Sequence, residues 1–323
     1  MLTSKQVRSA QADLDVLFKT SEIMNEAESY KKMSFVEQLR REVGTPSGYK
    51  VYLSDRAYAS FERLYELAQR SLPSRKLLVS NDVYSACKSV LGEWYERDGI
   101  EQVTSYFEGV EARVNDLISD YRFYSVLTGV NFQDIERMEF GAVELCKPDI
   151  TKLQEARGKE SVINAAWREM QHNLWMTAKV RGSWNYAEKK FFQLTKISCG
   201  VLAVAFTLCL ERGGAALRLI PGVEGRFKPG VVRWFSVEEK SRSLHYKESY
   251  EGLSCVDLNK DVFCAFKECD WFGELSRISQ SDSGADLESA VRRGLYWFFD
   301  AQADNSTEMK FVKYWSCIEC IFS

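Results

Sequence analysis

The chain contains two histidines, His172 and His245, and these side chains would exchange protons most readily near neutral pH. Three carboxylates lie close to His245 in the sequence: Glu238, Glu239 and Glu248. A histidine with carboxylates on one strand-turn-strand segment could work as a general acid-base centre. Charges this closely spaced are more typical of a solvated face, and no nucleophile elbow, P-loop or metal signature accompanies them. We therefore interpret both histidines as surface or structural residues, with an enzyme in this segment as the minor alternative.

Cys317 and Cys320 form the only CxxC pair of the chain. Zinc sites commonly combine such a pair with a second one or with histidines. Neither stands nearby in this sequence, and the spacing also suits neighbouring positions on one helix. We expect these cysteines to be packing residues, and we expect neither a metal nor a cofactor.

The composition indicates a globular protein with little overall charge. The 323 residues are 45% hydrophobic and 28% charged, which is enough chain for two domains and a buried core. Lys and Arg number 43 against 46 Asp and Glu, a net charge of -3. The overall charge therefore gives no attraction to nucleic acid or to an anionic membrane.

The sequence carries no recognisable targeting segment. Polar and acidic residues interrupt residues 1–18, where a signal peptide would be continuously apolar. The longest apolar run, Ile197–Leu210, is short for a hydrocarbon core of about 30 Å, so we expect a buried core helix. Nine cysteines, an odd number among apolar neighbours, suit a reducing compartment. These features predict a cytoplasmic protein that does not enter a membrane.

Residues 1–120 are predicted to be mainly helical. Leu14 and Leu17 share one face of a helix, and Phe61, Leu64 and later apolar residues repeat that spacing. Clusters of glycine, proline and small polar residues separate the helices. This part of the chain is therefore expected to form a helical N-terminal region.

Residues 121–280 mix strand and helix patterns, which predicts an α+β region. Apolar residues two apart indicate a strand over 174–180. Asn185, with Glu188 three residues later, predicts the start of a helix that runs to about Leu210. The other expected elements are strands at 216–220, 231–237 and 242–250 and a helix over 259–278.

Residues 281–323 are predicted to form two antiparallel helices joined by a short turn. Asp286 can cap the first helix, and Asn305 or Ser306 can cap the second. One face of the second helix is apolar and carries Phe311, Tyr314, Trp315, Ile318 and Phe322. Such a pair is half of a helical bundle, so we expect an apolar patch that further helices or a partner would cover.

The stretch AVRRGLYWFFDAQADNSTEMKFVKYWSCIECIF, residues 290–322, resembles the opening helix pair of HEPN (higher eukaryotes and prokaryotes nucleotide-binding) domains of the ApeA-like group. In that group a helix with an arginine and aromatic residues precedes a short acidic loop and a helix of the form F-x3-W-x3-E. Phe311, Trp315 and Glu319 stand at those positions. The α+β region upstream is similar to the region that commonly precedes such domains, so the resemblance covers about residues 121–323.

The resemblance implies a prokaryotic defence-type protein that cleaves RNA without a metal, usually as a dimer. In this family an arginine and a histidine, four to six residues apart on a later helix, move the proton and stabilise the phosphate charge. This sequence lacks that pair, because Arg168 and His172 are separated by three residues and Arg242 and His245 by two. We therefore expect an incomplete HEPN domain, inactive in this form, in which Glu319 could support a catalytic arginine.

An alternative interpretation is a module without catalysis. The helix pair would then serve as a surface for a second copy, another protein or RNA. Under either interpretation the expected partners are RNA and a second copy bound through the C-terminal helices.

Overall fold

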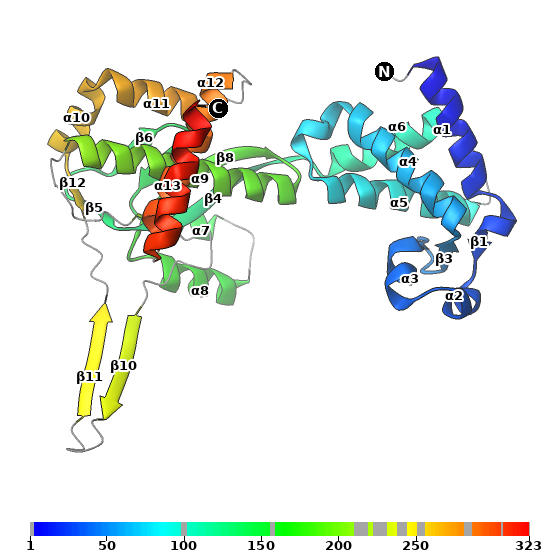
Figure 1. The fold of residues 1–323 in the computed structure, drawn as a ribbon, viewed down its shortest axis with the longest axis horizontal. Helices are drawn as coiled ribbons and strands as arrows, with labels where there is room; N and C mark the ends of the chain where they lie inside the picture. Colours follow the sequence, from blue (N-terminus) through cyan, green and yellow to red (C-terminus); the bar gives the residue numbers. More distant parts are fainter. Residues whose placement is uncertain are drawn as a thin grey trace. The chain divides into compact units, whose positions relative to one another are not determined.

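The computed structural model describes residues 3–97, 102–155, 159–209, 219–221, 231–237, 244–250, 256–280, 286–304 and 306–322 (Figure 1). Contacts divide the chain into two compact units. The first combines Met1–Tyr121 with Arg181–Glu188, and the second combines Arg122–Val180 with Lys189–Ser323. The architecture is α+β, as the sequence predicts.

The first unit is mainly helical and also contains a small antiparallel sheet that the sequence analysis missed. The sheet has the order β1-β3-β2, with Met24 opposite Tyr52 and Val43 opposite Val51. Its strands are β1 (Ile23–Met24), β2 (Glu42–Gly44) and β3 (Lys50–Leu53). The helices are α1 (Ser4–Leu17), α2 (Glu26–Lys32), α3 (Phe35–Arg41), α4 (Asp55–Ser71), α5 (Ser80–Arg97) and α6 (Val103–Asp116), with short 3-10 turns at Thr20–Glu22 and Pro73–Leu77.

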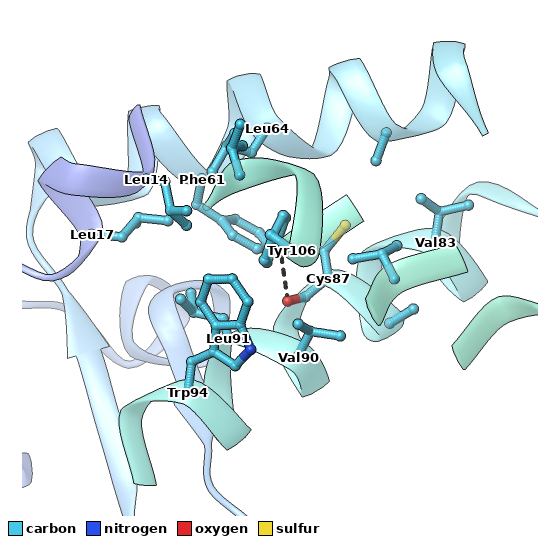
Figure 2. Packing of buried hydrophobic residues seen from close by; sticks show 14 of the residues in the cluster. Leu14, Leu17, Phe61, Leu64, Val83, Cys87, Val90, Leu91, Trp94 and Tyr106 are labelled. Atoms are coloured by element: carbon cyan, nitrogen blue, oxygen red, sulfur yellow. Dashed lines mark hydrogen bonds between the residues drawn. The ribbon is translucent and has the colours of Figure 1, made fainter. Parts of the chain in front are cut away.

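Large apolar side chains from α1, α4, α5 and α6 meet in one core (Figure 2). The faces that the helical spacing predicts are confirmed, since Leu14 and Phe61 are fully buried. Tyr106 is also buried, and its hydroxyl donates to the Cys87 carbonyl oxygen at 3.1 Å. Burial raises the pKa of the Cys87 thiol to about 12, so this cysteine stays protonated and acts as a small apolar residue.

The second unit is built on a five-stranded sheet of order β6-β7-β8-β4-β9. Strand β8 (Leu174–Gly182) covers the predicted strand over 174–180, and β10 (Val231–Val237) matches another prediction. The remaining sheet strands are β4 (Ser119–Thr128), β6 (Arg137–Phe140), β7 (Val143–Cys146) and β9 (Ile220–Pro221). Two smaller pairs are β5 (Val130–Phe132) with β12 (Val256–Leu258), parallel, and β10 with β11 (Leu244–Tyr250), antiparallel.

Helix α9 (Trp184–Cys209) is the long apolar helix that the sequence indicates. Its N-terminus is capped by Ser183, whose Oγ accepts from the Tyr186 N–H at 3.3 Å, and not by Asn185 as predicted. Among the described residues it alone is long and apolar enough to cross a membrane, but 67% of its apolar window is buried in the protein. The predicted core helix is confirmed, although the complete helix is longer than its apolar run.

The other helices of the second unit include two that the sequence did not predict, α7 (Ile150–Gln154) and α8 (Glu160–Met170), and one prediction that needs correction. The helix expected over 259–278 is wrong as a single element, because Cys269 adopts an extended conformation between two helices. Asn259 caps the first of them, accepting from the Val262 N–H at 2.9 Å. The remaining helices are α10 (Lys260–Glu268), α11 (Asp270–Gln280), α12 (Asp286–Ala303) and α13 (Thr307–Phe322).

Candidate functional site

The predicted helix pair at the C-terminal end exists as α12 and α13 (Figure 1). Ser306 supplies the cap of α13, since its Oγ accepts from the Met309 N–H at 3.2 Å. The helices approach closely where α12 carries Gly294, because a Cβ there would lie 3.7 Å from the Cys317 carbonyl oxygen. The Phe298 and Tyr314 rings lie 5.8 Å apart one turn further along. The hairpin is therefore antiparallel and packed along its length.

Two buried lysines hold three helices together. Lys196 of α9 and Lys313 of α13 are 5% and 6% exposed, and both ammonium groups face Asp300 of α12. The Lys313 Nζ lies 2.6 Å from an Asp300 oxygen and 2.6 Å from an Asp304 oxygen, whereas the Lys196 Nζ lies 3.7 Å from Asp300. Two ammonium groups and two carboxylates balance in charge, as burial requires.

The electrostatics of this cluster keep Lys313 charged. Burial by itself would lower the pKa of its ammonium group, but the hydrogen bonds and charges of Asp300 and Asp304 outweigh that effect and raise the pKa. An ammonium group that stays protonated cannot accept a proton as a general base. The cluster therefore fits a structural role better than acid-base catalysis.

Most of the apolar face of α13 points away from α12, although Tyr314 and Ile321 at the edge of this face also contact that helix. Phe311 is 69% exposed, Trp315 is 55% exposed and Phe322 is 84% exposed, whereas the face toward α12 carries Lys313 and Cys317. The sequence-based expectation of an uncovered apolar patch thus agrees with these exposures. We call this surface the α13 stripe; it consists of Phe311, Tyr314, Trp315, Ile318, Ile321 and Phe322.

Glu319, the residue expected to support a catalytic arginine, lies at the surface beside the α13 stripe. Its Oε1 accepts a hydrogen bond of 2.7 Å from the Trp315 Nε1. Within the described part of the chain no lysine or arginine forms an ion pair with it. In the structure this carboxylate thus bonds to the indole ring of Trp315.

His172 does not form a site with Arg168, the arginine nearest to it in sequence. His172 is exposed in the turn after α8, and Arg168 is exposed within that helix, with no bond between their side chains. His245 lies on β11 opposite Ser236 of β10, and Glu248 lies on the same strand opposite Arg233. Glu238, Glu239 and Arg242 lie outside the described residues.

Cys317 and Cys320 are both partly buried in the hairpin. Burial, reinforced by the neighbouring Cys320, raises the pKa of the Cys317 thiol, whereas metal binding requires the thiolate. Where the chain is described, no group of three or more His, Cys, Asp or Glu side chains is arranged to hold a metal ion.

Lys196, Asp300 and Lys313 were not predicted, because no local sequence pattern marks them as partners. Lys313 stands between apolar residues of an amphipathic helix, and its partner Asp300 lies across the turn. The helical spacing of α13 could have placed Lys313 on the face opposite the apolar one, but it could not identify Asp300 as the partner.

Comparison with models of protein families, with curated proteins and with solved structures finds no match for this chain.

Proposed function

We propose that the C-terminal helix pair is an association module, and that the α13 stripe binds the same stripe of a second copy of this chain. The observation that carries this proposal is the exposure of the six large apolar side chains of the α13 stripe on one helix. Contiguous apolar surface of this kind on a globular protein usually marks an interaction site.

The spacing of the stripe favours another helix as its partner. Phe311, Trp315, Ile318 and Phe322 follow one another at intervals of four, three and four residues, which is the spacing of a two-helix seam. A seam of this kind is complementary to itself across a two-fold axis, so a second copy satisfies it without a different partner sequence.

The area also suits a dimer. If a large side chain has about 200 Å² of surface, the exposed parts of the six side chains of the α13 stripe add up to roughly 700 Å². A standard stable interface buries on the order of 800 Å² on each partner. The α13 stripe alone therefore supplies most of the surface that a stable dimer needs.

The charge of this surface supports a protein partner over RNA. The α13 stripe contains no lysine or arginine, and Lys313 of the same helix is buried on the other face. Binding to a phosphate backbone depends on cationic side chains that release counterions. The RNA cleavage implied by the HEPN resemblance stays a prediction, because the sequence lacks an arginine and a histidine at the spacing of that family.

The proposal is tested by the mass of the protein in solution. Ile318→Glu places a charge in the middle of the stripe, and we expect it to weaken self-association at least about a hundredfold, since a buried unpaired charge costs several kcal/mol. Sedimentation equilibrium of the wild type and of the variant measures this change.

The matched control is Val162→Glu, which places the same charge at an exposed apolar residue of α8. It is expected to leave the dimerisation constant unchanged. A wild-type chain that stays monomeric at about 100 µM would refute the proposal, because an interface of this size normally binds more tightly.

A further inference from the structure

A pocket of about 320 Å³ lies between α9 and α12, within the second unit. Its volume falls in the range of about 300 to 1,000 Å³ that is typical of small-molecule sites. None of its lining residues belongs to the α13 stripe. The lining residues are Gln193, Ile197, Ser289, Arg292, Arg293, Tyr296 and Trp297.

The polar part of the lining is suited to an anion. Two consecutive arginines, Arg292 and Arg293, line the pocket, and none of the lining residues is acidic. Guanidinium groups bind the oxygens of phosphates and carboxylates through paired, charge-assisted hydrogen bonds. The Ser289 hydroxyl and the Gln193 amide add neutral donors.

The remaining lining is aromatic and apolar. The Tyr296 and Trp297 rings lie edge to face, 5.9 Å apart, and Ile197 completes this part of the wall. Aromatic rings and guanidinium planes both stack on flat aromatic ligands. The lining therefore combines a site for an oxyanion with a site for a planar ring.

Tyr296 is held in the wall of the pocket by contacts with α9. The Lys196 Nζ donates to the Tyr296 hydroxyl at 3.0 Å, and the same ammonium group lies 4.7 Å from the centre of the tyrosine ring. Asp300 in turn lies 3.7 Å from Lys196. Gly200 lets α12 approach α9, because a Cβ there would lie 2.5 Å from the Leu295 carbonyl oxygen. A side chain that is already held in place needs less ordering when a ligand binds, which lowers the entropic cost.

We propose that this pocket binds a small organic anion, in which a phosphate or carboxylate group is joined to a planar aromatic body. The arginines bind the oxyanion, and Tyr296 and Trp297 contact the ring. Lys196 does not line the pocket and is a positioning residue, since its ammonium group donates to the Tyr296 hydroxyl.

Calorimetric titration with four probes tests the proposal: 1-naphthyl phosphate, 1-naphthoate, 1-naphthol and inorganic phosphate. At least one of the two aromatic anions is expected to bind about tenfold or more tightly than both naphthol, which lacks the anion, and phosphate, which lacks the ring. Preference for naphthyl phosphate identifies a phosphate ester as the ligand class, and preference for naphthoate identifies a carboxylate. Failure of both anions to bind at millimolar concentration would refute the proposal.

Arg293→Gln locates the binding. Arg293 is exposed, so its replacement is expected to preserve the fold and to weaken binding of the preferred anion about tenfold or more. The control is Arg168→Gln, an exposed arginine of α8 that does not line the pocket. Equal affinity in the wild type and in Arg293→Gln would contradict this site. Ile318 does not line the pocket, so Ile318→Glu is expected to bind the anion as the wild type does. The titration therefore tests the pocket separately from self-association.

Discussion

At the scale of single residues, the most informative group is the pair of buried lysines around Asp300. Lys313 occupies the face of α13 that packs on α12, where an apolar residue would be expected. Its ammonium group is compensated by Asp300 and Asp304, both at 2.6 Å. Buried ion pairs of this kind fix one arrangement of helices, since a shifted arrangement would leave the charges unpaired.

Lys313→Met is expected to lower the free energy of unfolding by about 3 to 5 kcal/mol, because two partly buried carboxylates lose their nearest ammonium group. Urea unfolding followed by circular dichroism measures this loss. Lys310→Met is the control on the same helix, at a partly exposed position with no ion pair among the described residues. It should change the free energy by no more than about 0.5 kcal/mol.

The stability difference between the wild type and Lys313→Met is expected to depend on pH. The pKa of Lys313 is raised in the folded state, so its contribution is complete below the ordinary lysine value of 10.5 and is lost as the pH rises through the raised value. The difference in unfolding free energy between the wild type and Lys313→Met should therefore be constant from about pH 7 to 9 and shrink above about pH 10.5. A difference that grows at alkaline pH would contradict this assignment.

At the scale of elements, the contact between α9 and α12 sets the position of the C-terminal helix pair. Gly200 is buried on α9, directly against the Leu295 carbonyl oxygen of α12. Backbone-to-backbone approach brings Lys196 within reach of Tyr296 and Asp300. A larger residue at this position would separate the helices and weaken those bonds.

Gly200→Ala is expected to destabilise the protein by about 1 to 3 kcal/mol, as overpacking in a core usually does. Gly273→Ala on α11 is the control, because nothing lies within 4 Å of the added Cβ. That substitution should be neutral or stabilising by up to about 1 kcal/mol, since alanine has the higher helix propensity. Thermal unfolding of both variants measures the contrast, and equal melting temperatures would argue against the close approach.

At the scale of the whole molecule, the chain returns to its first unit after leaving it. Arg181–Glu188 belongs to the same unit as Met1–Tyr121, although β4 and β8 of the second unit lie between them in sequence. Asp82 of α5 makes the connection. It accepts from the Val79 N–H and from the Asn185 amide, both at 3.0 Å, and it also bonds to the Ser183 hydroxyl.

Asp82→Ala is expected to lower the free energy of unfolding by about 3 kcal/mol, because three donors lose a buried acceptor. Hydrogen exchange should accelerate at the amides of residues 181–188. Asp116→Ala, at an exposed position of α6, is the control and should leave that exchange unchanged. Equal protection of 181–188 in both variants would show that other contacts hold the returning segment.

Local periodicity was sufficient for much of the fold. It located the apolar faces of α1 and α4, strand β8 and the helix pair α12–α13. It failed for the sheet β1-β3-β2, whose strands are two to four residues long and carry too few alternations to detect. It also failed at Cys269, because neither glycine nor proline marks the break between α10 and α11.

The sequence by itself determined that α13 is an amphipathic helix with a stripe of large apolar residues, since that property depends only on residues within a few turns. Only the tertiary structure decided which face turns inward. The contact at Gly294 and the pairing of Lys313 with Asp300 turn the face that carries Lys313 and Cys317 toward α12 and leave most of the α13 stripe exposed. The physical reason is that ion pairs and backbone contacts join residues far apart in sequence, beyond the range of any local pattern.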